Sequence, residues 1–182
     1  MFKMNTTAII MLFFTIFTSN SYFAQNKLTA SAYAEKASKE LNVDKDKIYY
    51  LAEGTGSVGD KYLKNGFSLL TFINGDKSAN FTIIQNTCGI SDITKKVVLE
   101  NLSSPNQFEN LIYKNLITKD IFEDDGQEII AVLFYKKDFA PMLGDYVKKL
   151  KQLEKKEGIS FIILTLEGKN EIKGIDDIVE SF

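Results

Sequence analysis

The sequence predicts a single α/β (α+β) domain with a mixed sheet, in which an antiparallel N-terminal meander precedes a C-terminal β-α-β unit. Residues 129–135 are apolar without alternation, which is typical of a strand covered on both faces. Residues 159–166 form a second buried run, and residues 141–157 between them repeat apolar side chains every three or four positions. A helix of this length between two buried strands predicts a parallel pair.

Residues 141–157 are predicted to cover the sheet through one apolar face that includes Leu150, with lysines on the opposite face. Asp138 is expected to cap this helix, and Pro141 suits a first helical turn, where a missing N–H is tolerated. Gly158 is expected to end it.

The N-terminal half predicts extended strands joined by tight turns. Asn74–Gly75 lies between the apolar runs 67–73 and 81–85, and this dipeptide is a strong hairpin signal. Residues 48–52 predict a strand before the hairpin. Residues 91–102 fit both a helix and a short strand, so both states stay open for them.

Two further helices are predicted from their N-terminal signals. Residues 30–41 carry a modest amphipathic pattern, with Thr29 and Ser31 as alternative caps. Ser104–Pro105 supplies a cap followed by a proline at the first helical position, so residues 105–118 are predicted to be helical. The chain is expected to close with a short strand at residues 171–173 and a short helix around residues 175–179.

Residues 1–24 have the layout of a secretory signal peptide. Lys3 precedes an apolar run at residues 8–17, which is shorter than a membrane-spanning helix requires, and small residues follow it. Cleavage is expected between residues 21 and 24, which leaves residues 25–182 as one globular domain without a membrane span. The sequence therefore predicts an exported bacterial protein that is periplasmic or secreted.

The composition disfavours several classes of chemistry. All basic residues are lysines, and the chain has no histidine, so it lacks both the guanidinium fork for phosphates and the neutral-pH proton shuttle. A slightly acidic chain without arginine is a poor candidate for binding nucleic acid. Cys88 is the single cysteine, so no internal disulfide can form, and we expect a buried, inert thiol there.

A glycine-rich stretch after the strand at residues 48–52 matches the pattern G-x-G-x-x-G. That pattern needs a helix opening at its third glycine, and Asn65–Gly66 follows too closely to allow one. We therefore expect no dinucleotide or other cofactor here. The stretch is predicted to be a connecting loop that could bind a ligand through Gly54, Thr55, Gly56, Ser57 and Gly59.

One acidic stretch imitates the spacing of a calcium loop. Asn42, Asp44, Asp46 and Glu53 fall at ligand positions, but Lys47 replaces the required glycine, and a strand replaces the following helix. A solvated acidic turn is the expected structure, and no metal site is predicted.

The order strand, helix, strand, helix, strand predicted from Lys96 onward resembles the first half of a thioredoxin-like domain. That family carries a Cys-x-x-Cys pair at the start of the helix after the second strand, where this chain has Lys137–Pro141 without cysteine. The resemblance covers under half of the chain and implies a redox-inactive relative.

The sequence does not single out a catalytic group. No spacing marks a pair among the 24 acidic residues as an acid–base couple. We expect a non-enzymatic binding or interaction module for an unknown protein or small molecule. The alternatives are a carboxylate-based hydrolase or transferase and a redox-inactive thioredoxin-like domain.

Overall fold

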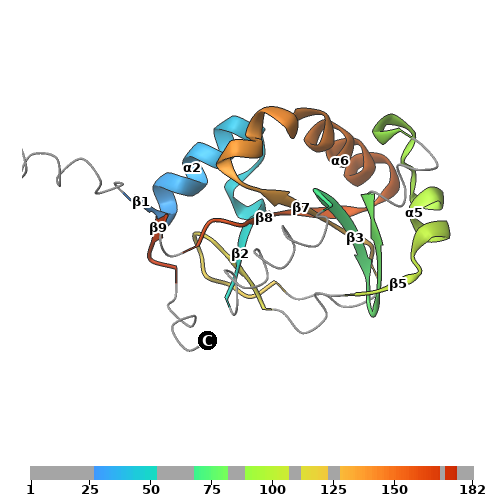
Figure 1. Cartoon of the computed structure of the whole chain (residues 1–182), viewed down its shortest axis with the longest axis horizontal. Coiled ribbons are helices and arrows are strands. Elements are labelled where there is room, and N and C mark those ends of the chain that lie inside the picture. The colour runs from blue at the N-terminus through green and yellow to red at the C-terminus, as the bar shows by residue number, and fades with distance from the viewer. Residues whose placement is uncertain are drawn as a thin grey trace, which may run out of the picture.

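A mixed seven-stranded sheet forms the centre of the protein, and α2 and α6 lie together over one of its faces (Figure 1). The computed structural model describes residues 27–52, 68–81, 89–106, 112–122, 128–168 and 171–175. The helices and 3-10 turns are α2 (Ala30–Leu41), η1 (Lys45–Lys47), η2 (Ile90–Asp92), α5 (Lys95–Asn101), η3 (Lys137–Met142) and α6 (Gly144–Glu157). The strands are β1 (Leu28–Thr29), β2 (Ile48–Leu51), β3 (Leu70–Asn74), β4 (Lys77–Asn80), β5 (Ser104–Pro105), β6 (Tyr113–Asn115), β7 (Ile130–Tyr135), β8 (Ser160–Thr165) and β9 (Ile172–Lys173).

The strand order in the large sheet is β5-β4-β3-β7-β8-β2-β6. β7 and β8 are parallel, and β2 lies parallel to β8 on its other side. β3 is antiparallel to both β4 and β7, and β6 is antiparallel to β2. The predicted α/β class with a mixed sheet is therefore confirmed. A separate two-stranded parallel sheet joins β1 to β9, which confirms the strand predicted at residues 171–173.

The β7-α6-β8 unit is confirmed, with a later helix start than predicted. α6 begins at Gly144, because η3 occupies the preceding residues and contains Pro141. The prediction that Asp138 caps the helix is wrong, since Leu143 is the N-cap of α6 and no side chain bonds there. Gly158 ends the helix in the left-handed conformation at φ 64°, as its lack of a Cβ allows.

Both faces of the sheet are apolar, which explains the uninterrupted run in β7. One face packs against the helices through side chains such as Leu133, Leu150 and Ile163. The opposite face buries a second cluster, in which Val132 and Phe134 lie beside strand neighbours and beside Phe122. The residues of this second cluster are Leu51, Ile73, Ile130, Val132, Phe134, Ile162 and Leu164.

The predicted hairpin is present, but its second strand begins earlier than expected. Asn74 pairs with Lys77, so Gly75 and Asp76 alone form the turn, with Gly75 at φ 56°. Because the turn has only two residues, β4 begins directly after it at Lys77 and ends at Asn80. The prediction of a strand from residue 81 is wrong at Phe81, and residues 82–85 lie outside the described part of the chain.

The helix predicted at residues 105–118 is contradicted at residues 105–106 and 112–118, while residues 107–111 lie outside the described part of the chain. Pro105 lies in the two-residue edge strand β5, where it faces Lys77 of β4 and the Ser78 hydroxyl donates to its carbonyl at 3.1 Å. Proline is tolerated on a sheet edge because its missing N–H breaks no ladder bond there. β6 follows, and the Asn115 side chain accepts from the Ile117 and Thr118 N–H groups at the turn that leaves it.

The two open alternatives near helices are decided by capping bonds. Residues 95–101 form α5, because the Thr94 side chain accepts a hydrogen bond from the Val97 N–H at 3.3 Å. Thr29, not Ser31, caps α2, and its Oγ1 accepts from the Ala32 N–H at 3.2 Å.

Thr29→Ala is expected to lower the free energy of unfolding by about 1 kcal/mol, because one N–H at the start of α2 loses its acceptor. Urea denaturation measures this loss. Thr29→Ser keeps the acceptor and should restore most of the stability, while Ser31→Ala, at an exposed position, serves as the control. Equal losses from the Thr29→Ala and Ser31→Ala variants would contradict the capping role of Thr29.

Several predictions concern residues outside the described part of the chain. These are the signal peptide at residues 1–24, the glycine-rich stretch at residues 54–59, Cys88, and the helix around residues 175–179, of which only Ile175 is described. Among the helices that the structure describes, none has the length and apolar character to cross a membrane.

Candidate functional site

The strongest candidate site lies where the parallel strands β2, β7 and β8 end. Parallel strands finish at one edge of a sheet, and open α/β sheets bind ligands outside the carboxyl ends of their strands. Here this edge, called the carboxyl edge below, contains Tyr135 at the end of β7, Thr165 at the end of β8, and Glu167 just beyond. β2 also ends at this edge, at Leu51. In the sequence, the glycine-rich stretch begins three residues later, at Gly54.

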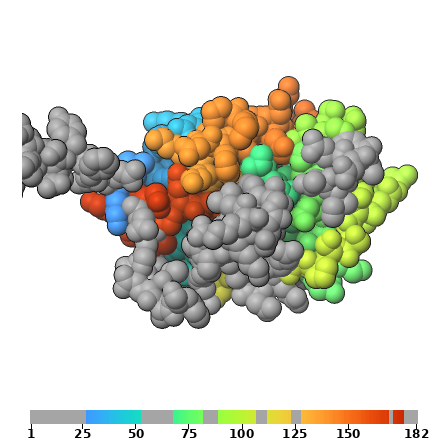
Figure 2. Space-filling view, in the orientation of Figure 1, coloured from blue at the N-terminus to red at the C-terminus, as the bar shows by residue number. Residues whose placement is uncertain are grey.

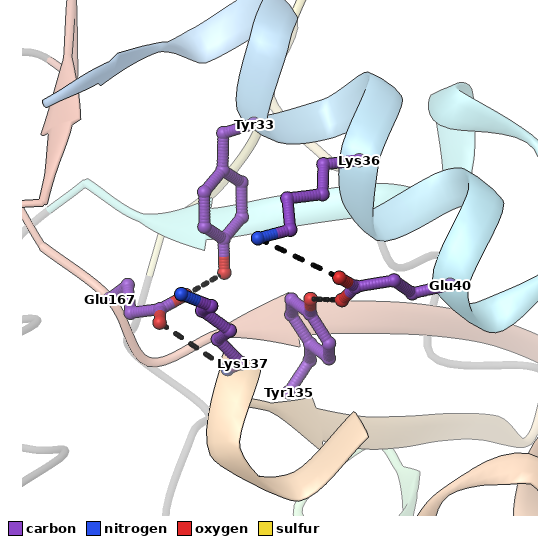
Figure 3. Close-up of polar contacts among 6 residues, drawn as sticks. All are labelled: Tyr33, Lys36, Glu40, Tyr135, Lys137 and Glu167. Atoms are coloured by element: carbon purple, nitrogen blue, oxygen red, sulfur yellow. Dashed lines mark hydrogen bonds and ion pairs between the residues drawn. The ribbon is translucent and has the colours of Figure 1, made fainter. Parts of the chain in front are cut away.

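Two tyrosine–carboxylate hydrogen bonds join α2 to the carboxyl edge (Figure 3). The Tyr33 hydroxyl of α2 donates to the Glu167 carboxylate, and the Tyr135 hydroxyl of β7 donates to Glu40 Oε2 of α2 at 2.6 Å. Tyr33 and Glu40 are seven residues apart, which places them on one face of the helix. α2 thus supplies one donor and one acceptor, and the carboxyl edge supplies the other donor and acceptor. The two hydrogen bonds join the helix to the sheet at two points.

Glu167 is almost fully buried, with 8% of its surface exposed. Its second carboxylate oxygen accepts the backbone N–H of Lys137 at 3.3 Å. The Tyr33 hydroxyl also lies 2.8 Å from Thr165 Oγ1, which accepts the Glu167 N–H at 3.1 Å. Among the described residues no buried polar side-chain atom lacks a hydrogen-bond partner, so this cluster is internally satisfied.

Burial raises the pKa of both tyrosine hydroxyls far above their ordinary value. For Tyr33 the bond to Glu167 raises the pKa further, and for Tyr135 the bond to Glu40 does so. Both hydroxyls therefore stay protonated at physiological pH and act as hydrogen-bond donors. A general acid or base works best with a pKa near the working pH, so these tyrosines are suited to holding structure and not to transferring protons.

The carboxyl edge also presents exposed apolar surface. η3 leaves the end of β7 there, and α6 begins there before it returns along the sheet to β8. Met142, the last residue of η3, is 56% exposed, and the neighbouring Pro141 is also exposed. Figure 2 shows the orange surface of η3 and early α6 beside the blue surface of α2.

The residues with calcium-like spacing serve other purposes in the fold. Asn42 is the C-cap of α2, and Asp44 is the N-cap of η1. The backbone carbonyl of Asp46 accepts the Asn115 side-chain N–H at 2.7 Å, and Glu53 lies outside the described residues. In the described ranges no three metal-ligating side chains gather to hold an ion.

No local pattern in the sequence marks the tyrosine–carboxylate cluster as a whole. Tyr33 reads as one more apolar position on an alanine-rich helix face, and Glu40 reads as a solvated charge. A signal was present in the seven-residue spacing of the two side chains. Their partners lie more than 90 residues further along the chain, and no local pattern connects them.

The element order behind the thioredoxin-like resemblance is not present. Lys96 lies in a helix, and the described parts of the range 105–118 contain strands β5 and β6 instead of a helix. Only the β7-α6-β8 part of the expected order remains. The chain matches no protein-family model, no curated protein and no solved structure.

Proposed function

We propose that this protein is an exported, non-enzymatic binding module of the periplasm or cell exterior, which contacts its partner at the carboxyl edge. The observation that carries the proposal is the contrast between the two kinds of group at this edge. The carboxylate and hydroxyl groups of Glu167, Tyr33 and Tyr135 are bonded to protein groups, while the Met142 side chain faces solvent.

This contrast favours recognition over catalysis. An enzyme that used carboxylates would need an acid or base available to its substrate, and Glu167 is both buried and bonded on each oxygen. Methionine, in turn, is flexible and polarizable, and it adapts to varied partner surfaces. The exposed side chains of Met142 and Pro141 suit a protein or peptide partner. The glycine-rich stretch around Gly54–Gly59 would supply further contacts from the end of β2.

A photo-crosslinking amino acid at position 142 is expected to capture a partner protein in intact cells. The reactive group would replace Met142, so it would sit at the proposed contact surface. Adducts separated on a denaturing gel and identified by mass spectrometry provide the measurement.

The matched control carries the same crosslinker at Lys148, an exposed position on α6 outside the carboxyl edge. One defined adduct from position 142 and none from position 148 supports the proposal. Equal adducts from both positions, or none from either, contradict a partner at this edge. Turnover of ester, phosphate or glycoside test substrates that Glu40→Gln or Glu167→Gln abolishes would instead favour the carboxylate-based hydrolase.

The exported form is expected to begin between Tyr22 and Gln25, because cleavage is predicted between residues 21 and 24. Intact-mass measurement of protein purified from the periplasm or medium checks this expectation. A mature chain that still carries Met1 would contradict both the signal peptide and the proposed location.

A further inference from the structure

A surface hollow of about 480 Å³ lies at the opposite end of the sheet from the carboxyl edge. It is formed by the C-terminal end of α2, by η1 and by the middle of α6, and Phe161 near the start of β8 contributes to its wall. Volumes of this order accommodate small molecules in proteins. The hollow is separate from the carboxyl edge, so a ligand bound in the hollow is independent of the proposed function.

One wall of the hollow already holds an ammonium group. Lys47 Nζ lies 2.5 Å from Glu154 Oε1 and 4.3 Å from the centre of the Phe161 ring. A carboxylate together with an aromatic face is an arrangement that stabilises a cation. Because Lys47 is held at this position, its charge and that of Glu154 balance each other. The other charged residues of the lining therefore determine which charges a ligand must have.

The remaining lining offers one uncompensated charge of each sign. Within the described residues the Asp44 carboxylate has neither an ion pair nor a hydrogen bond. Lys151 donates to the backbone carbonyl of Asn42, and no described carboxylate lies within ion-pair distance of it. Lys39, which also lines the hollow, is paired with Glu35 at 3.0 Å.

The end of α2 adds to this polarity. Asn42 caps the helix in the left-handed conformation at φ 53°, so the last carbonyl groups of α2 lie at the hollow. The C-terminal end of a helix carries partial negative charge and favours a cation. The backbone carbonyl of Asn42 at this helix end already accepts a hydrogen bond from Lys151 Nζ, so Lys151 is the cation held there. A ligand ammonium group is therefore left to pair with Asp44, and a ligand carboxylate with Lys151.

We propose that the hollow between α2, η1 and α6 binds a small zwitterion of amino-acid size. The ammonium group of the ligand pairs with Asp44, and its carboxylate pairs with Lys151. A purely anionic ligand would leave the Asp44 carboxylate without a partner, and a purely cationic ligand would leave the Lys151 ammonium without one. Val43 and Phe161 also line the hollow but are almost fully buried, so the charged side chains determine which ligand fits.

Titration of the ¹⁵N-labelled mature protein with L-leucine tests this proposal by NMR. Saturable shifts are expected at the amides of Asn42, Asp44 and Lys151. N-acetyl-L-leucine lacks the ammonium group and L-leucinamide lacks the carboxylate, so each should bind at least about tenfold more weakly.

Asp44→Asn and Lys151→Gln are each expected to weaken L-leucine binding about tenfold, because each removes one charge partner. Lys148→Gln on the same helix, outside the hollow, is the matched control and should leave affinity unchanged. Melting temperatures establish that the variants are folded. No saturable shift up to about 10 mM L-leucine would overturn the proposal, as would either analogue binding as tightly as L-leucine. Unchanged affinity in both hollow variants would also overturn it.

Discussion

Leu150→Ala is expected to lower the free energy of unfolding by about 2–5 kcal/mol, the largest effect that we predict for a single substitution. Leu150 is fully buried, with 0% exposure, in the cluster between α6 and the sheet. Truncation removes apolar contacts and leaves a cavity, because the close-packed side chains around it relax only partly. Urea denaturation with an unchanged m-value measures the loss.

The matched control is Lys148→Ala on the exposed face of the same helix. It should change the free energy of unfolding by no more than about 0.5 kcal/mol, because the side chain faces water. Similar losses from Leu150→Ala and Lys148→Ala would mean that α6 presents a different face to the sheet.

The second large effect is a loss of stability in alkaline solution that depends on Tyr33. The folded pKa of Tyr33 is raised above its unfolded value, so its contribution is fully present below about pH 10 and is lost as the pH rises through the folded pKa. Between the unfolded and the folded pKa, a single tyrosine of this kind lowers the free energy of unfolding by about 1.4 kcal/mol for each unit of rising pH. Tyr33→Phe removes this titration, so the variant should lose stability less steeply than the wild-type protein above pH 10.

Comparison between variants is needed because lysines also lose their charge in this pH range. Tyr146→Phe is the matched control, since burial alone raises the pKa of Tyr146 and no carboxylate contributes to the shift. For the Tyr146→Phe variant, the free energy of unfolding should fall with pH above 10 at a rate closer to that of the wild-type protein. Guanidinium denaturation from pH 8 to 11 gives the slopes, and identical slopes for the Tyr33→Phe variant and the wild-type protein would contradict the raised pKa.

The cluster of Tyr33, Tyr135, Glu40 and Glu167 also explains how the carboxyl edge stays ordered. Tyr33, Tyr135 and Glu167 are buried, so another arrangement would leave one of their polar groups unpaired. Glu40 is exposed and pairs with Lys36 at 3.7 Å as well as with Tyr135. α2 is thereby held at Glu167, next to the end of β8, and at Tyr135, the end of β7. η3 starts from the same place, directly after β7, and its last residue is the exposed Met142.

The errors in the sequence-based predictions arise where a local helix signal competes with another structure of similar stability. Ser104–Pro105 carries a strong local helix signal, yet the chain gains more by pairing this dipeptide with β4 at the sheet edge. Asp138 and Pro141 likewise signal a helix start, but the local chain forms a 3-10 turn before α6 begins. Local sequence signals indicate which secondary structure a segment can form by itself. The surrounding structure determines which of two secondary structures of similar stability is adopted.

The sequence by itself determined the strand–helix–strand centre of this protein, because burial on both faces leaves an apolar run and burial on one helix face leaves a three-to-four-residue repeat. It also determined that the chain lacks histidine, arginine and any internal disulfide. Only the tertiary structure placed β2 beside β8 and brought Tyr33 to Glu167, a separation of 134 residues. Such contacts depend on which distant segments become neighbours, and hydrophobic periodicity carries no information about that choice.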